Sequence, residues 1–488
     1  MTDITKLSAF EMKRMICEKE ISSRELIELH FNKIDEMEKS INAFITLNKE
    51  EALKLADKVD EKIRNGEKVG LLSGIPIGVK DNIMTKNLRT TCGSKMLENF
   101  IPPYDATVVE RIKSADGIIM GKTNMDEFAM GSSTETSYFG PTKNPIDLER
   151  VPGGSSGGSA AAVRAGEVAL SLGTDTGGSI RQPASYCDVV GIKPTYGIVS
   201  RYGTVAMANT LDQVGVFGRD VKDAVLMLSS ITGYDEKDST SFKNPDGTII
   251  FGSFPKEMDY DNYLKGMKIA IPKEIFNIGI DSSIKEQMNK SIKIFEALGA
   301  EISEISLPHL EYALAAYYII STSELSSNLA RFDGVRYGHR AKEYTTLDEL
   351  YTNSRTEAFG EEVKRRIMLG TYSLTKGYAE EHYKKALKVR TLIIEDFNNV
   401  FSKYDVILSP TSPILPFKFG EKLKDPLAMY KADLFTAPIN LAGICAMSVP
   451  CGSIDGLPLG LQIIGDKYKE ANIIKAGLGF EGGIKNGL

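Results

Sequence analysis

Residues 152–183 read PGGSSGGSAAAVRAGEVALSLGTDTGGSIRQP and contain two clusters of glycine and serine. The first cluster, GGSSGG, leads into a helix of small residues. The apolar run at 168–173 predicts a buried strand, which ends just before the second cluster, TDTGGS. Glycine permits backbone shapes closed to other residues and lets another group come close. The pattern therefore places Ser179 in a tight turn, just past a strand end and before a helix.

Ser179 is the candidate nucleophile of this turn. The backbone N–H groups of Thr176, Gly177, Gly178 and Ser179 could converge on one point, and such a nest of donors suits a developing oxyanion. A serine hydroxyl is a poor nucleophile until a base takes its proton. The turn therefore predicts a base elsewhere in the chain.

Lys80 is a better candidate for that base than any histidine. It ends the stretch GIPIGVK, and a lysine at the end of a buried strand loses solvation, which lowers its pKa toward neutrality. None of the histidines lies in a setting rich in glycine and serine, and we expect structural or surface roles for them. They are His30, His309, His339 and His382.

Short apolar runs alternate with helical stretches from about residue 70 onward. Their length and their glycine and proline flanks favour buried strands. The runs are IPIGV (75–79), GIIMG (117–121), VALSLG (168–173), KIAIP (268–272) and VILSP (406–410). Strands separated by helices predict an α/β sheet with helices on its faces.

The first fifty residues favour helices. Two S-x-x-E spacings, at 8–11 and at 22–25, are typical of helix starts. After the second, Ile27, Phe31 and Ile34 fall on one helix face, which predicts a helix that covers a core.

Composition bounds the class of protein. The 488 residues are 42% hydrophobic and 25% charged, which is ordinary for a globular enzyme, and no apolar stretch is long enough to span a membrane. A net charge of −6 gives no general attraction to nucleic acid or anionic membranes. The five cysteines are scattered, odd in number and without a CxxC pair, and we see no signal peptide. Reduced thiols in the cytoplasm are therefore expected, without a disulfide framework or zinc site.

Three segments in order resemble the amidase signature family: GIPIGVKDNI, GGSSGGSAA and DTGGSIRQP. The family's catalytic unit is a Ser–cis-Ser–Lys triad. The resemblance implies Lys80 as base, Ser155 as the cis-serine that relays protons and Ser179 as nucleophile. It also implies a single α/β/α domain with a mixed, largely parallel sheet covered by helices, and N-terminal helices packed outside.

Further stretches are similar to one branch of that family, the A subunits of amidotransferases that convert Glu-tRNA(Gln), or Asp-tRNA(Asn), to Gln-tRNA(Gln) or Asn-tRNA(Asn). The stretches are 123–145, 189–203, 326–338, 364–372 and 429–452. The resemblance implies that glutamine is hydrolysed here, held by Tyr317, Arg366 and Asp433. It implies B and C subunits as partners. It assigns tRNA, ATP and Mg²⁺ to the B subunit, with no metal or cofactor in this chain.

The same resemblance divides the chain into an N-terminal helical segment (1–70), an amidase signature domain (71–470) and a glycine-rich tail (471–488). The tail lacks the closing aromatic helix of the family, so we expect an irregular or disordered end. Val216 stands where the family usually has proline, and we expect a change in a local turn. The polar stretch 234–266 favours a surface excursion or a join between two halves.

Three other readings stay open. The chain could be a free-standing amidase for small amides, or a catalytically inactive scaffold in the same assembly. A nucleotide-binding protein is the third, although GGSSGG lacks the Gly-Lys-Ser/Thr ending of a P-loop.

Overall fold

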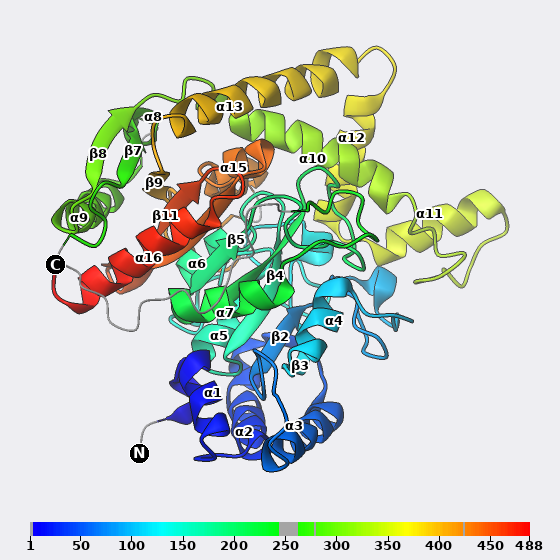
Figure 1. Cartoon of the computed structure of the whole chain (residues 1–488). Helices are drawn as coiled ribbons and strands as arrows, with labels where there is room; N and C mark the ends of the chain where they lie inside the picture. The colour runs from blue at the N-terminus through cyan, green and yellow to red at the C-terminus, as the bar shows by residue number, and fades with distance from the viewer. Residues whose placement is uncertain (1–2, 244–261, 278–279, 423–424) are drawn as a thin grey trace.

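The computed structural model describes residues 3–243, 262–277, 280–422 and 425–488. Within them the chain builds a sheet of eleven strands in the order β1-β3-β2-β4-β6-β5-β10-β11-β9-β7-β8 (Figure 1). The strands are β1 Phe44–Leu47, β2 Pro76–Lys80, β3 Ile118–Thr123, β4 Leu170–Asp175, β5 Val190–Lys193, β6 Gln213–Gly218, β7 Lys268–Pro272, β8 Glu301–Ile305, β9 Val406–Pro410, β10 Cys445–Ile454 and β11 Leu457–Gly465. The five predicted strands are confirmed as β2, β3, β4, β7 and β9.

The sheet is mixed, as the sequence predicted. Its parallel pairs form two groups, β3-β2-β4 on one side and β9-β7-β8 on the other. The strands between these groups pair antiparallel, from β4 through β6, β5, β10 and β11 to β9. The parallel character expected from the resemblance is therefore confined to the two groups, while antiparallel strands join them.

Helices cover both faces of the sheet, which confirms the α/β class. One face carries α4 Thr107–Ser114, α7 Val221–Ile231, α9 Ser282–Ala297 and α16 Glu470–Lys485. The other carries α5 Gly157–Ala165, α6 Arg181–Tyr186, α13 Lys385–Phe401 and α15 Ala437–Ala442. None of the described helices is long and apolar enough to cross a membrane.

The N-terminal helices form as predicted. They are α1 Ala9–Cys17, α2 Ser23–Ile41 and α3 Lys49–Arg64, and they pack outside the main sheet (Figure 1). Ser22 and Glu25 make a complete capping box, whereas Ser8 caps α1 through its side chain alone. Strand β1 follows α2 in the chain and pairs with β3, and it was not predicted from the sequence. The division of the chain at residues 70 and 470 stays a prediction.

Val216 does not disturb a turn, so that expectation is wrong. It lies in the middle of β6, where it faces Leu172 of β4 and Ile192 of β5 in the two ladders. Proline has no N–H to donate to a ladder, whereas valine keeps the donor and suits a buried strand. The exchange therefore fits a regular strand here.

The glycine-rich end is also ordered, contrary to expectation. Residues 470–485 form the regular helix α16, and Phe480 stacks on Phe295 with ring centroids 5.2 Å apart. A Cβ on Gly477 would lie 2.3 Å from Cε of Met447, so the absent side chain lets the helix approach β10 closely. Small residues thus let a regular helix pack closely on the sheet, where an irregular end was expected.

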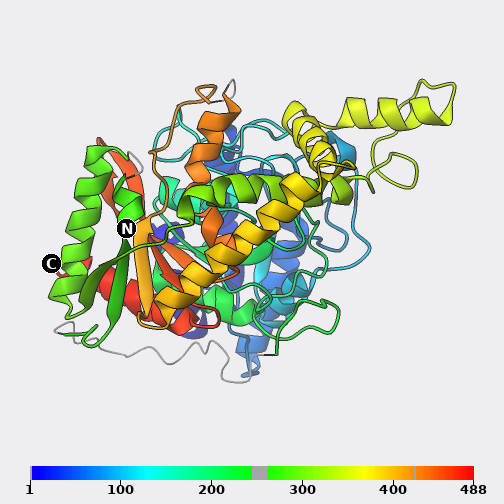
Figure 2. The same ribbon diagram turned by 90° about the horizontal axis from the view of Figure 1, so that it is seen from above.

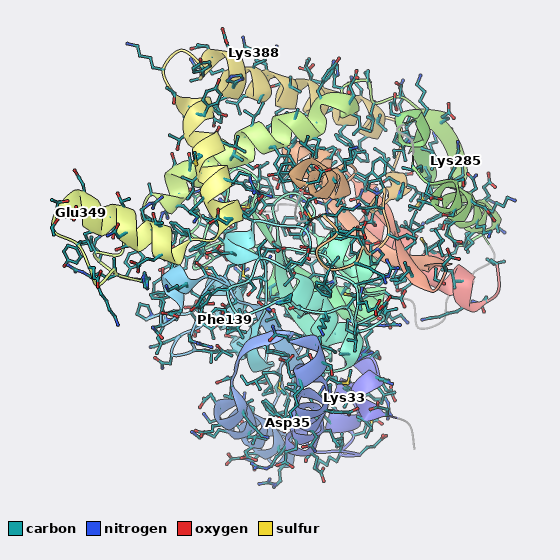
Figure 3. All side chains as sticks on the ribbon, turned by 180° about the vertical axis from the view of Figure 1, so that it is seen from behind. Lys33, Asp35, Phe139, Lys285, Glu349 and Lys388 are labelled. Carbon is teal, nitrogen blue, oxygen red and sulfur yellow. The ribbon has the colours of Figure 1, made fainter. Side chains whose placement is uncertain are left out.

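The helices α10 Ala313–Leu329 and α12 Glu361–Leu374 pack against each other, and α11 Leu347–Ala358 lies between them in the chain. α11 projects away from the body, as the view from above shows (Figure 2), and Glu349 marks it in Figure 3. In the polar excursion 234–266, residues 244–261 lie outside the described part. The carboxylate of Asp235 ties the described beginning to the body by accepting from Thr107 Oγ1 at 2.5 Å.

Candidate active site

The site is built at the ends of two parallel neighbours in the sheet. Lys80 is the last residue of β2, and Asp175 is the last residue of β4, which pairs with β2. Parallel strands end at the same edge, so the lysine comes beside the turn that follows β4. Ser155 and Ser156 arrive from the loop before α5, after a cis Gly154–Ser155 peptide bond.

Lys80 is fully buried and contacts two serines. Its Nζ donates to Ser155 Oγ at 2.8 Å and to Ser156 Oγ at 2.7 Å. Burial lowers the pKa of Lys80 to about 7, although the carboxylates of Asp126 and Asp175 oppose this shift. A substantial share of neutral amine is therefore present near pH 7, as a general base needs.

The two serines are not equivalent partners of this lysine. Ser156 Oγ also donates to the carbonyl oxygen of Thr174 at 3.1 Å. A hydroxyl has one proton, so Ser156 can only accept from Lys80 while that bond is made. Over the described residues, Ser155 Oγ has no hydrogen-bond partner but Lys80. Ser155 is thus the serine whose proton is free to move to a neutral Lys80.

The turn that carries Ser179 is held by a buried ion pair. The Asp175 carboxylate accepts from the amides of Gly178 at 2.8 Å and Ile180 at 3.2 Å, and pairs with Arg181 at 2.9 Å. Burial favours the neutral acid, but Arg181, together with Lys193 and a hydrogen bond from Asn440, outweighs burial and lowers the pKa of Asp175 to about 2. The Ser179 carbonyl accepts from Ser156 N at 3.2 Å, which brings the two serine segments together.

The four predicted oxyanion donors separate into two kinds. The amide of Gly178 is used by Asp175, so it supports the turn. In the part of the chain that the structure describes, no residue accepts from the amides of Thr176, Gly177 and Ser179. Those three remain the candidates for an oxyanion hole.

Tyr317 and Gly177 are in close contact. Tyr317 is buried in α10, and a Cβ on Gly177 would lie 2.3 Å from its ring carbon Cζ. Only glycine fits beneath this ring. The structure therefore places Tyr317 against the nucleophile turn.

Asp433, from the short 3₁₀ helix Lys431–Asp433, is buried and doubly hydrogen-bonded. Its carboxylate accepts from Ser132 Oγ at 3.1 Å and from Tyr318 Oη at 2.8 Å. Burial raises the pKa of Asp433 to about 7, against the opposing effects of the Tyr318 hydrogen bond and the Arg366 charge.

Arg366 is a buried residue of α12. Its Nε donates to Glu362 Oε1 at 2.7 Å, one helical turn earlier, and its guanidinium lies over the rings of Tyr318 and Tyr430 at 5.4 and 5.3 Å. A cavity of about 240 Å³ opens beside Arg366 and Tyr430. Of the predicted glutamine-binding residues only Arg366 lines this cavity, and Ser179 does not line it either.

Four residues of this arrangement were not predicted from the sequence. Ser156 lies within the same GGSSGG cluster as Ser155, and Tyr318 directly follows Tyr317. Glu362 could have been found from its i, i+4 spacing to Arg366, the usual spacing of a helical ion pair. Ser132 carried no signal of its own.

The histidines lie in other settings, as predicted. His30 is buried against the carbonyl of Glu167, His309 pairs with Asp396, His339 pairs with Glu357 and His382 stacks on Tyr378. All five cysteines are free. Across the described residues, no group of three or more histidine, cysteine or acidic side chains is placed to hold a metal ion.

Comparisons with known proteins agree on one family. The chain is 55% identical over 487 residues to the A subunit of glutamyl-tRNA(Gln) amidotransferase from Caldanaerobacter subterraneus subsp. tengcongensis, covering 99% of this chain and 97% of that one. The crystal structure of the corresponding protein from Thermotoga maritima superposes with a TM-score of 0.78 at 42% identity, covering 97% and 94% of the two chains. Peptide amidase from Stenotrophomonas maltophilia shares the fold, with a TM-score of 0.78 at 26% identity over 97% and 96%. A family profile described as Amidase matches residues 25–474, and the chain belongs to this amidase family.

Proposed function

We propose that this chain is the A subunit of a glutamyl-tRNA(Gln) amidotransferase, the one that hydrolyses glutamine. The relative that is 55% identical over nearly the whole chain carries that name. The single observation that carries the proposal is the pairing of two sites. The first is the buried Lys80–Ser155 contact, and the second is a buried carboxylate and guanidinium, Asp433 and Arg366, both of which Tyr318 contacts. An α-amino acid that carries its amide in the side chain, such as glutamine, offers the complementary α-ammonium and α-carboxylate.

The residues divide the chemistry as follows. Neutral Lys80 takes a proton from Ser155, which takes the proton of Ser179 as Ser179 attacks the side-chain amide carbon of glutamine. The backbone amides of Thr176, Gly177 and Ser179 stabilise the negative oxygen that forms. The relay then returns the proton to the nitrogen, the C–N bond breaks and ammonia leaves. Water hydrolyses the remaining γ-glutamyl ester and regenerates the serine.

Recognition of glutamine follows from charge. The guanidinium of Arg366 suits the α-carboxylate, and because Glu362 takes its Nε–H, the terminal nitrogens would meet the ligand. Ionised Asp433 suits the α-ammonium. Tyr317 lies against Gly177 of the nucleophile turn and its ring centroid is 5.0 Å from that of Tyr318, so it would contact the substrate chain.

The ammonia serves a partner. Ammonia that escapes into water near pH 7 is mostly protonated, and the ammonium ion has no lone pair with which to attack an activated carboxylate. We therefore expect the site that makes ammonia to open directly toward the site that uses it. We assign that user to a B subunit that holds the mischarged tRNA, Glu-tRNA(Gln) or Asp-tRNA(Asn), with ATP and Mg²⁺. A small C subunit completes a cytoplasmic heterotrimer, and this chain itself carries no metal or cofactor.

The test is transfer of labelled nitrogen in the assembled complex. Amide-¹⁵N glutamine, mischarged tRNA and ATP are supplied together with an excess of unlabelled ammonium. We expect the label to reach the tRNA undiluted and glutaminase activity to rise when tRNA and ATP are present. Dilution of the label in proportion to the external ammonium contradicts internal transfer.

The second candidate is a free-standing amidase, favoured by the shared fold of the peptide amidase. Its expected signature is full glutaminase or amidase activity in the purified chain alone, with no response to partner subunits. The Asp433 and Arg366 pair favours the amidotransferase, because simple amides offer neither α-group.

A further inference from the structure

Tyr318 contacts both charged residues of the proposed glutamine site. Its hydroxyl donates to Asp433 Oδ2 at 2.8 Å, and its ring lies under the Arg366 guanidinium at 5.4 Å. The side chain belongs to α10, whereas Arg366 belongs to α12 and Asp433 follows α14 Pro426–Tyr430. One side chain therefore joins two groups that come from different parts of the chain.

A second aromatic residue closes the arrangement. The ring of Tyr430 stacks on that of Tyr318 with centroids 3.9 Å apart, and its hydroxyl donates to Glu362 at 3.1 Å. Glu362 in turn accepts from Arg366 at 2.7 Å. The contacts thus run in a circuit from Asp433 through Tyr318 and Tyr430 to Glu362 and Arg366.

We propose that Tyr318 is a positioning residue that fixes Asp433 relative to Arg366, and thereby sets the preference for amides that carry both an α-ammonium and an α-carboxylate. This inference rests on the proposed function of the chain as a glutaminase. The buried charges of Asp433 and Arg366 attract each other. Tyr318 contacts each of them separately, through its hydroxyl and its ring face, beside Ser132 on Asp433 and Glu362 on Arg366. Both charged groups are thereby held in place and remain available to a ligand.

The charges around Asp433 make glutamine binding depend on pH. The titratable and charged groups around Asp433 are Tyr186, Tyr317, Tyr318, Arg366 and Asp175, with Ser132 as a neutral donor. Asp433 must be ionised to hold an ammonium group, and the Tyr318 hydrogen bond favours the ionised form. Removing that hydroxyl raises the pKa of Asp433. As the pH is lowered, Asp433 is then protonated earlier, and glutamine binding is lost at a higher pH than in the unmodified site.

The experiment measures binding in a Ser179→Ala background, which keeps the ligand intact. Dissociation constants are obtained by calorimetry for glutamine and for glutaramate, which has the carboxylate and the amide but lacks the ammonium. The full chain is used, with its partner subunits where they co-purify. Tyr318→Phe is compared with Tyr196→Phe, because the Tyr196 hydroxyl donates to the carbonyl of Asn209 at 2.7 Å and contacts neither charged residue.

We expect Tyr318→Phe to raise the dissociation constant of glutamine about tenfold and that of glutaramate far less, because a lost hydrogen bond to a charged group has about this effect. The pH midpoint of glutamine binding should move upward. Tyr196→Phe should leave both the preference and the midpoint unchanged.

Two results would overturn the inference, and they are distinguishable. If glutamine and glutaramate both bind more weakly by the same factor, and the pH midpoint of glutamine binding does not move, Tyr318 is only structural. The proposed function is then unaffected. Failure of the Ser179→Ala chain to bind glutamine at all contradicts the proposed function itself, and the inference falls with it.

Discussion

Lys80 Nζ lies 2.7 Å from Ser156 Oγ and 2.8 Å from Ser155 Oγ, so the proposed base contacts two neighbouring serines. Distance does not distinguish them, but the direction of their protons does. Ser156 donates to Thr174, which leaves Ser155 as the proton donor to a neutral lysine. This difference leads to the first prediction.

Ser155→Ala should lower the kcat of glutamine hydrolysis by a factor of about 10²–10⁴, the usual contribution of a proton-transfer group. Ser156→Ala should lower the same kcat by at most about tenfold, since it removes only one hydrogen bond that holds Lys80. Steady-state kinetics on the two variants checks this. Equal losses would show that the neighbouring serines share the relay.

Ser179→Ala should abolish glutamine hydrolysis and leave the fold intact. Loss of a nucleophile typically costs orders of magnitude in kcat, whereas removal of one small, nearly buried hydroxyl changes little packing. A glutaminase assay and a thermal unfolding curve measured on the same sample test both halves. Residual activity above a few per cent of the wild type would move the nucleophile elsewhere.

The value of kcat/KM for glutamine should fall as the pH is lowered, because two groups become protonated. Lys80 must be neutral and Asp433 ionised, and each has a pKa of about 7, so protonation of either one stops the reaction with glutamine. The logarithmic slope below about pH 6 should therefore approach two for glutamine and one for a simple aliphatic amide, which does not need Asp433. Lys80→Ala should remove turnover, and near-normal turnover in that variant means that the base lies elsewhere.

Arg366→Met and Asp433→Asn should raise the KM for glutamine by roughly ten- to a hundredfold, the effect of one lost charged hydrogen bond. Hydrolysis of an aliphatic amide without α-groups should be nearly unchanged. Parallel assays with the two substrates give the comparison. If both substrates suffer equally, the two residues support the fold.

Much of the fold was predictable because strand signals are local. Apolar runs with glycine and proline flanks gave β2 and β4, and the motif spacing gave the residues at their ends. β1 and the antiparallel centre of the sheet were not predictable in this way, since pairing depends on residues far apart in the chain. The glycines of α16 were misjudged because a local propensity against helix was outweighed by close packing on β10.

The site showed the same limit. The Lys80 and Ser155 contact followed from motifs, but the proton direction at Ser156 depends on where the Thr174 carbonyl points. Tyr318 was missed for a similar reason. A tyrosine on a helix shows its partners only when α12 and the 3₁₀ turn at Asp433 are packed beside it.

The order of strands in the sheet also bears on how the chain is made. β10 and β11 lie between β5 and β9, and so join the part of the sheet built from β1 to β6 to the part built from β7 to β9. A ribosome synthesises these two strands after all the other strands of the sheet. Until β10 and β11 have been synthesised, β5 and β9 each have an unpaired edge. Such edges can pair with the wrong strand or bind a chaperone.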